Sequence, residues 1–105
     1  MAQWNVYANP AARARDEIPY LVVVQSDLLD DLATRMVVPL SRSSAQVAGE
    51  SLRLAPEFEV AGERLRLKPH EAGAMPARVL GKAVASLKAE SHRIVDALDT
   101  VISGV

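Results

Sequence analysis

The feature of this sequence that most constrains its fold is an apolar stripe in residues 86–105, SLKAESHRIVDALDTVISGV. Large apolar residues recur there at spacings of three, four and seven: Leu87, Ile94, Leu98, Val101, Ile102 and Val105. This spacing places them on one face of an α-helix. The pattern predicts a helix over residues 86–105, and it is the only long helical pattern in the chain. The preceding residues must supply the surface against which the stripe packs.

The charges of the predicted helix oppose the helix dipole. Lys88 and Arg93 lie in its first half, whereas Asp96 and Asp99 lie toward its carbonyl end. A carboxylate at that end costs roughly 0.3–1 kcal/mol, because the free carbonyl groups there already carry partial negative charge. Two interpretations stay open. Either a solvated surface tolerates this cost, or the negative, apolar-tipped end is kept to meet a basic partner.

Length and composition fit one domain over residues 1–105. Half of the 105 residues are hydrophobic, enough to bury a modest core without metal or disulfide. The net charge of -1 argues against naked nucleic acid as the main partner. The chain has no cysteine, which fits a reducing cytoplasm. Its start has no signal-peptide pattern, and no apolar run approaches the length of a membrane span, so we expect a cytoplasmic protein.

Short strand patterns precede the helical stripe. Residues 3–7 alternate between apolar and polar, as in a half-buried strand. Residues 20–24 are unbroken and β-branched, which predicts a central strand covered on both faces. Residues 36–40 form another apolar strand, in which Pro39 indicates a sheet edge or a strand end because proline has no N–H to donate. Residues 75–80 predict a final short strand.

Residues 57–68 predict a β-hairpin. Phe58 and Val60 alternate with glutamates, Ala61 and Gly62 supply a turn, and leucines then alternate with cations. The cations are Arg64, Arg66 and Lys68. Their stripe fits a solvated strand face, and the alternative is a groove for an acidic partner or a polyphosphate. With five or six strands and one helix, the chain predicts an α+β fold built on a curled antiparallel sheet.

The residues that could carry catalysis or bind metal form no complete set. His70 and Glu71 begin like a zinc-protease helix, but Ala74 stands where the second histidine is needed. The acidic residues after the second strand, Asp27, Asp30 and Asp31, lack the spacing of a calcium loop and are interpreted as loop and cap carboxylates. No serine is flanked by the glycines of a nucleophile elbow. We therefore expect no metal, no cofactor and no enzymatic activity.

Three stretches of the chain resemble the CcdB family of toxins from toxin–antitoxin modules. They are YLVVVQSDLLDDLATRMVVPL at residues 20–40, MPARVLG at residues 75–81, and the terminal ISGV. The most specific part is VQSD at residues 24–27 followed by RMVVPL at residues 35–40, and the resemblance covers essentially the whole chain. It implies an SH3-like barrel of the CcdB, Kid and MazF type, with a small curled antiparallel sheet, a C-terminal α-helix and a homodimeric assembly.

The resemblance also implies a function. Members of the family bind the A subunit of DNA gyrase and trap the enzyme on cleaved DNA, and their gyrase contacts concentrate at the last residues. The corresponding positions here are Asp96, Asp99, Ser103, Gly104 and Val105. The best-known member has a tryptophan where Ser103 stands and asparagines where Asp96 and Asp99 stand. Losing an aromatic stack removes about 1 to 3 kcal/mol of binding, so the potency and the target of this chain can differ from that member's.

A second implied partner is a CcdA-like antitoxin, partly disordered, which folds as it wraps the toxin dimer. Two surface segments are candidates for contacting it. Arg13 and Arg15 lie in a charged connection at residues 11–17. A polar loop at residues 41–49 begins with Ser41, Arg42 and Ser43.

A different function stays open as the alternative. The same fold serves endoribonuclease toxins of the Kid and MazF kind, in which an arginine, an acid and sometimes a histidine cleave single-stranded RNA in the dimer groove. Such a set is available in Arg64, Arg66, His70 and Glu71. The chain lacks the arginine-proline turn that those enzymes usually carry near the end of their first strand, and it is not basic, so gyrase poisoning is favoured. An inactive or retargeted relative is the third possibility.

Overall fold

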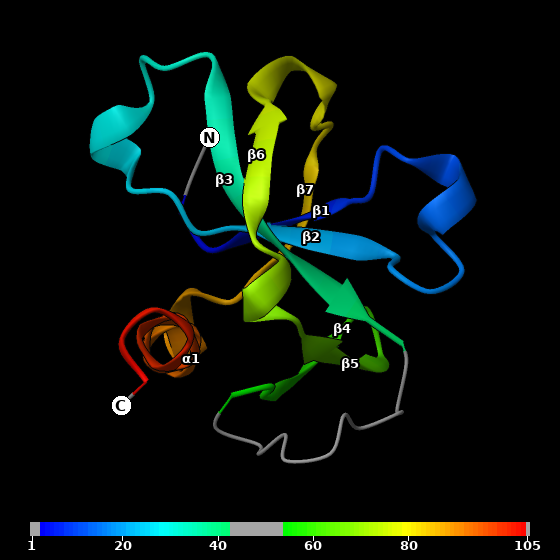
Figure 1. Cartoon of the computed structure of the whole chain (residues 1–105). Coiled ribbons are helices and arrows are strands. Elements are labelled where there is room, and N and C mark those ends of the chain that lie inside the picture. Colours follow the sequence, from blue (N-terminus) through cyan, green and yellow to red (C-terminus); the bar gives the residue numbers. More distant parts are fainter. Residues whose placement is uncertain (1–2, 43–53, 105) are drawn as a thin grey trace.

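The computed structural model describes residues 3–42 and 54–104, which form a curled antiparallel sheet with one α-helix against it (Figure 1). This confirms the predicted α+β fold. The strands are β1 (Asn5–Ala8), β2 (Tyr20–Val23), β3 (Thr34–Ser41), β4 (Glu57–Val60), β5 (Glu63–Leu67), β6 (Gly73–Pro76) and β7 (Ala83–Ser86), and the helix is α1 (Ser91–Ser103). Among the described residues no helix is long and apolar enough to cross a membrane.

The sheet is organised around β3. Its strand order is β4-β5-β3-β2-β1-β7, and β6 pairs separately with the first half of β3. On one side β3 pairs with β2 throughout its second half. On the other side its neighbour changes from β6 at residues 34–37 to β5 at residues 40–41. This change of partner turns the β4–β5 hairpin away from the rest of the sheet, as Figure 1 shows.

Pro39 lies near the end of β3 but within a central strand, so the expected sheet-edge position is wrong. Its carbonyl accepts a hydrogen bond from the N–H of Lys68 at 3.0 Å, which shows that its backbone faces the β5 side. On that side β6 pairs only as far as Val37, and β5 begins to pair at Leu40. Pro39 therefore occupies a gap between two neighbours, where the ladder requires no N–H.

The β4–β5 hairpin confirms its prediction. Ala61 and Gly62 form the turn with φ values of 52° and 80°, the left-handed conformation that a type I′ turn requires at both positions. The cation stripe differs from the expected solvated face. Arg64 is exposed, but Arg66 and Lys68 are only 7% and 8% exposed.

The core has two parts, because successive strand residues point to opposite faces of the sheet. The main core lies between the sheet and α1, and its fully buried members include Val22, Val38, Leu40, Leu65, Leu67 and Ile94. A smaller cluster on the opposite face contains Tyr7, Leu21, Val23, Val37 and Leu80. The predicted coverage of residues 20–24 on both faces is thereby confirmed.

The helix begins later than residue 86. Ser86 ends β7 and pairs with Asn5 of β1, and the N–H of Leu87 donates to the carbonyl of Trp4 at 2.9 Å. A 3-10 turn, η5 (Lys88–Glu90), then leads into α1 at Ser91. Sheet pairing thus overrides the helical pattern in these residues.

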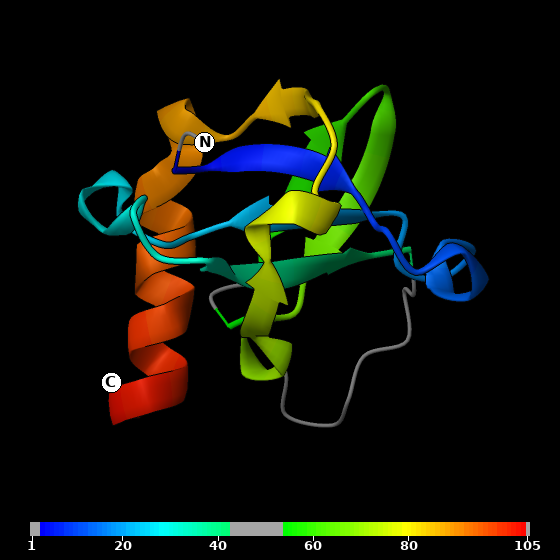
Figure 2. The ribbon, with the colours of Figure 1, turned by 90° about the horizontal axis from the view of Figure 1, so that it is seen from above.

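The apolar stripe of α1 is buried only in its first half. Leu87 and Ile94 are 5% and 0% exposed, and Ala97, which the pattern did not single out, is fully buried as well. Val101 and Ile102 are 39% and 79% exposed, so the stripe does not continue as core to its end. Figure 2 shows why: the last turns of α1 run past the edge of the sheet.

Candidate functional site

The predicted gyrase-binding residues lie at the projecting end of α1. Ser103 and Gly104 are exposed, and Gly104 ends the helix with a φ of 75° while its N–H donates to the carbonyl of Thr100 at 2.9 Å. This is the usual left-handed helix ending, which favours glycine. The hydroxyl of Ser103 donates to the carbonyl of Asp99 at 2.6 Å. Val105 lies outside the described residues.

Asp99 and Asp96 lie about one and two turns before the helix end. Their spacing of three residues places them on the same side of α1, where Asp99 is exposed and Asp96 is half-buried. Both carbonyls accept hydrogen bonds from hydroxyls one turn later, from Thr100 and Ser103. The structure therefore brings the described members of the predicted site together. We name this surface, formed by Asp96, Asp99, Ile102, Ser103 and Gly104, the helix tip.

A second exposed apolar surface was missed by the sequence reasoning. The loop that contains η2 (Asp27–Leu29) carries Leu28, Leu29 and Leu32, which are 92%, 48% and 52% exposed. The sequence analysis considered only the aspartates of this segment, although three leucines among polar residues were the available signal. Figures 1 and 2 place this loop away from the helix tip of the same chain.

We name this loop, which contains η2 and carries Leu28, Leu29 and Leu32, the leucine loop. It is held by two side chains from its base. The guanidinium of Arg35, which is 6% exposed, donates to the carbonyls of Asp30, Leu32 and Thr34. The amide of Gln25 donates to the carbonyls of Leu29 and Thr34, and accepts from the N–H of Met36. These bonds add to the backbone bonds inside the loop, in which the N–H groups of Leu29 and Leu32 donate to the carbonyls of Ser26 and Leu29, so the exposed leucines are presented from a fixed backbone.

The candidate antitoxin residues are only partly accessible. Arg13 is exposed on the 3-10 turn η1 (Ala12–Ala14), whereas Ser41 is 3% exposed, so its expected accessibility is wrong. Arg15 donates to the carbonyl of Asn9. Arg42 donates to the carbonyls of Arg15 and Asp16 and forms an ion pair with Glu63. Arg42 therefore joins the η1 loop to the hairpin turn. Ser43 and most of the loop at residues 41–49 lie outside the described residues.

The Arg42–Glu63 pair predicts a pH dependence. The hydrogen bond from Arg42 lowers the pKa of Glu63 below its ordinary value. A group with a lowered pKa stabilises the fold above its ordinary pKa, and this contribution is lost as the pH falls through the lowered value. The free energy of unfolding should therefore fall less on acidification in Glu63→Gln than in the original chain. The difference should be small, because both groups are exposed. Urea denaturation across acidic pH measures it; an equal change in the control Glu17→Gln would contradict the assignment.

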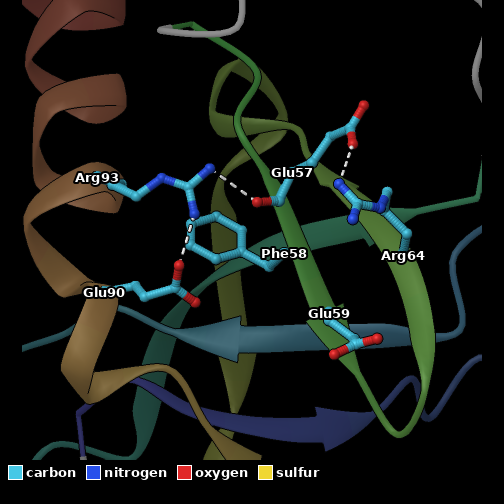
Figure 3. Close-up of a pocket in the computed structure, with 6 residues that line it drawn as sticks. All are labelled: Glu57, Phe58, Glu59, Arg64, Glu90 and Arg93. Atoms are coloured by element: carbon cyan, nitrogen blue, oxygen red, sulfur yellow. Dashed lines mark hydrogen bonds and ion pairs between the residues drawn. The ribbon is translucent and has the colours of Figure 1, made fainter.

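A hollow of about 520 Å³ lies between the β4–β5 hairpin and the start of α1 (Figure 3). It is lined by Glu57, Phe58, Glu59, Arg64, Glu90 and Arg93. The guanidinium of Arg93 lies 4.4 Å from the centroid of the Phe58 ring, donates to the Glu90 carboxylate at 2.7 Å and donates to the Glu57 carbonyl at 2.8 Å. Arg93 thereby joins α1 to β4.

The residues considered for ribonuclease activity lie on two elements, with Arg64 and Arg66 on β5 and His70 and Glu71 on the 3-10 turn that follows it. Arg66 is buried, where it donates to the Glu57 carboxylate at 2.9 Å. His70 and Glu71 lie on η3 (Pro69–Glu71), which packs against α1, and their side chains form a pair at 3.4 Å. Within the described part of the chain, no ion pair links His70 or Glu71 to the arginines of β5, and no group of three acidic or histidine side chains could hold a metal ion.

Comparison with solved structures supports the fold. An endoribonuclease in complex with its cognate antitoxin, from Mycobacterial species, superposes with a TM-score of 0.72 over 97% of this chain and 94% of that chain. The two sequences are 12% identical, so this similarity shows a shared SH3-like half-barrel and nothing about activity. A comparison with curated proteins found no match.

The family comparison goes further, because it matches the sequence itself. The model of the family described as CcdB protein matches residues 3–104, nearly the whole chain. The matched region contains every strand, the leucine loop and all described residues of the helix tip. The chain therefore belongs to the CcdB family, whose members are toxins of toxin–antitoxin modules.

Proposed function

We propose that this chain is a cytoplasmic toxin that binds the A subunit of DNA gyrase and traps the enzyme on cleaved DNA, which inhibits replication and growth. The observation that carries the proposal is the helix tip. Ile102 is 79% exposed at the end of a helix whose first half is packed in the core. A large apolar side chain that projects from a fixed element is typical of a residue at the centre of a protein interface.

The charges of the helix tip support a basic partner surface. Asp99 is exposed beside the carbonyl end of α1, where a carboxylate is unfavourable in isolation. An ion pair between a carboxylate and an arginine contributes more favourable free energy between two proteins than on an open surface, because water is excluded from the interface. Gly104 adds a position without a side chain, so a partner backbone can approach closely. Ser103 supplies no aromatic surface, and the apolar contact of this tip therefore depends on Ile102.

We further propose that the protein is a homodimer. The apolar strand β3 gives no support for a dimer, because Val37, Val38 and Leu40 are buried within the chain. The remaining reason is the exposed apolar residues of α1, since Val95 and Val101 are 43% and 39% exposed. A two-fold axis near α1 would cover these residues and present both helix tips on one surface. Sedimentation at micromolar concentration is expected to give twice the chain mass, and a monomer under those conditions would overturn the proposal.

A CcdA-like antitoxin is the proposed neutralising partner. Family membership supports an antitoxin, and the endoribonuclease of similar fold was solved with its own cognate antitoxin. The candidate contact that is exposed in the described residues comprises Arg13, Arg15 and Arg42. Because this contact lies outside the helix tip, antitoxin binding is expected to survive in part when the tip is removed.

The purified protein is expected to cleave neither RNA nor DNA by itself. The reason is that Arg66 is buried against Glu57, while His70 and Glu71 pair with each other on another element. Incubation with single-stranded RNA tests this expectation. Specific cleavage that is lost in His70→Ala, a change at an exposed side chain, would favour the endoribonuclease alternative over gyrase poisoning.

A further inference from the structure

The strand β4 has one open edge. Among the described residues it is the terminal strand of the sheet on the hairpin side, and there it pairs only with β5. The N–H of Leu67 donates to the carbonyl of Pro56 at 2.9 Å, just before β4 begins. Along a strand of an antiparallel pair, the N–H and carbonyl of every second residue point toward the partner strand, and those of the residues between them point away from it. The backbone groups of Phe58 and Val60 therefore face β5.

By the same alternation, the backbone groups of Glu57 and Glu59 face away from β5, toward the hollow. The side-chain contact of Arg93 agrees with this direction, because it donates to the carbonyl of Glu57 at 2.8 Å. At Glu59 the edge is open. Within residues 3–42 and 54–104, neither its N–H nor its carbonyl forms a hydrogen bond outside the β4–β5 ladder. Figure 3 shows β4 and the start of α1 facing each other across this gap.

The carboxylates beside the open edge differ in whether they form ion pairs. The Glu57 carboxylate is paired with Arg64 and Arg66, at 3.1 and 2.9 Å. The Glu90 carboxylate is paired with Arg93 at 2.7 Å. Glu59 is exposed and has no ion pair among the described residues, although Arg64 is its direct cross-strand neighbour. The residues that line the hollow carry three carboxylates and two guanidinium groups, a net charge of -1, and Glu59 is the carboxylate without an ion pair among the described residues.

We propose that this hollow binds an extended, basic peptide segment of a partner protein. The segment adds to the free edge of β4 through the N–H and carbonyl of Glu59, and it places a lysine or arginine side chain between the carboxylates of Glu59 and Glu90. An open strand edge is a template for such strand addition. The charge of the hollow favours a cationic side chain, because the carboxylate of Glu59 has no ion pair among the described residues, whereas that of Glu90 is already paired with Arg93.

Size and position fit this occupant. The volume of about 520 Å³ lies within the range of roughly 300–1,000 Å³ typical of ligand pockets. The hollow lies at the first turn of α1, whereas the helix tip lies at the last turn. The peptide site is therefore independent of the proposed gyrase contact, and failure of one proposal leaves the other standing.

The test uses the isotope-labelled full chain and a capped heptapeptide of alternating valine and arginine, followed by amide chemical shifts. We expect the shifts to centre on residues 57–61 and the Glu59 amide to become protected from hydrogen exchange. Glu59→Gln is expected to weaken binding about threefold, since one exposed ion pair is lost. Arg64→Gln is expected to strengthen it, because a competing cation is removed. Asp31→Asn, which removes a carboxylate from the distant leucine loop, is the matched control and should leave binding unchanged.

Two further peptides separate strand addition from charge alone. The same peptide with alternate backbone nitrogens methylated cannot pair with a strand edge, and it is expected to bind much more weakly. A peptide of alternating valine and glutamate is expected not to bind. Equal binding by either peptide, equal binding by Glu59→Gln, or shifts centred away from residues 57–61 would overturn the proposal.

Discussion

Deletion of residues 103–105 is expected to abolish growth inhibition and capture of the gyrase A subunit, while the protein remains folded. The deletion removes the left-handed ending at Gly104 together with the last contacts of the helix tip. The buried residues of α1, Ile94 and Ala97, lie at least one full turn earlier and keep their contacts. In a two-fold dimer each tip is presented twice, so one deletion removes two contacts.

The measurement is growth after induced expression, with pull-down of the gyrase A subunit and circular dichroism of the purified truncated protein. Ile102→Ser is the point variant of the same test, and Val84→Ser is its matched control, since Val84 is 51% exposed on β7 at the far edge of the sheet. The control should remain toxic. A folded truncated chain that remains fully toxic would show that the helix tip is not the effector surface.

Ile94→Ala is expected to lower the free energy of unfolding by about 2–5 kcal/mol. Ile94 is fully buried in the main core between α1 and the sheet, so the shorter side chain leaves a cavity. Val84→Ala is the control on β7, where the side chain is 51% exposed and lies outside the proposed dimer surface, and its effect should stay within about 0.5 kcal/mol. Urea denaturation at one fixed protein concentration measures both, because dimerisation makes stability depend on concentration. Equal effects would contradict the described packing of α1.

Much of the fold could be predicted from local patterns. The hairpin followed from alternation on both sides of Ala61 and Gly62, whose left-handed conformations the turn requires. The buried strand β2 followed from its continuous β-branched residues, which both faces of the sheet cover. These features depend on residues that are close in sequence, where propensity and period carry most of the information.

The parts that could not be predicted depend on contacts between distant residues. The strand β7 was missed and its last residue, Ser86, was assigned to the helix, because its pairing with β1 involves residues about 80 positions away. Arg66 was expected on a solvated face, but its ion pair with Glu57 allows it to be buried. Pro39 was expected at a sheet edge or a strand end; it lies near the end of β3 but in a central strand, because a sequence cannot reveal that β3 changes neighbours at that point.

The residues of the candidate site could be named from the sequence, but the exposure of the side chains around them could not be predicted. The terminal residues came from the family resemblance, whereas the exposure of Ile102 follows from how far α1 extends past the sheet. Helical periodicity placed Val101 and Ile102 with the core residues, because periodicity describes a face of the helix and not the extent of the surface that covers it. Leu28 was missed for a related reason: exposure of an apolar residue in a loop cannot be read from its type.

Titration of the purified A subunit of gyrase with the intact chain, followed by calorimetry, tests the central claim most directly. The proposed function predicts saturable binding by the intact chain and no detectable binding by the chain that lacks residues 103–105, with both proteins folded by circular dichroism. Absence of binding by the intact chain at micromolar concentration, or equal binding by the two chains, would contradict it.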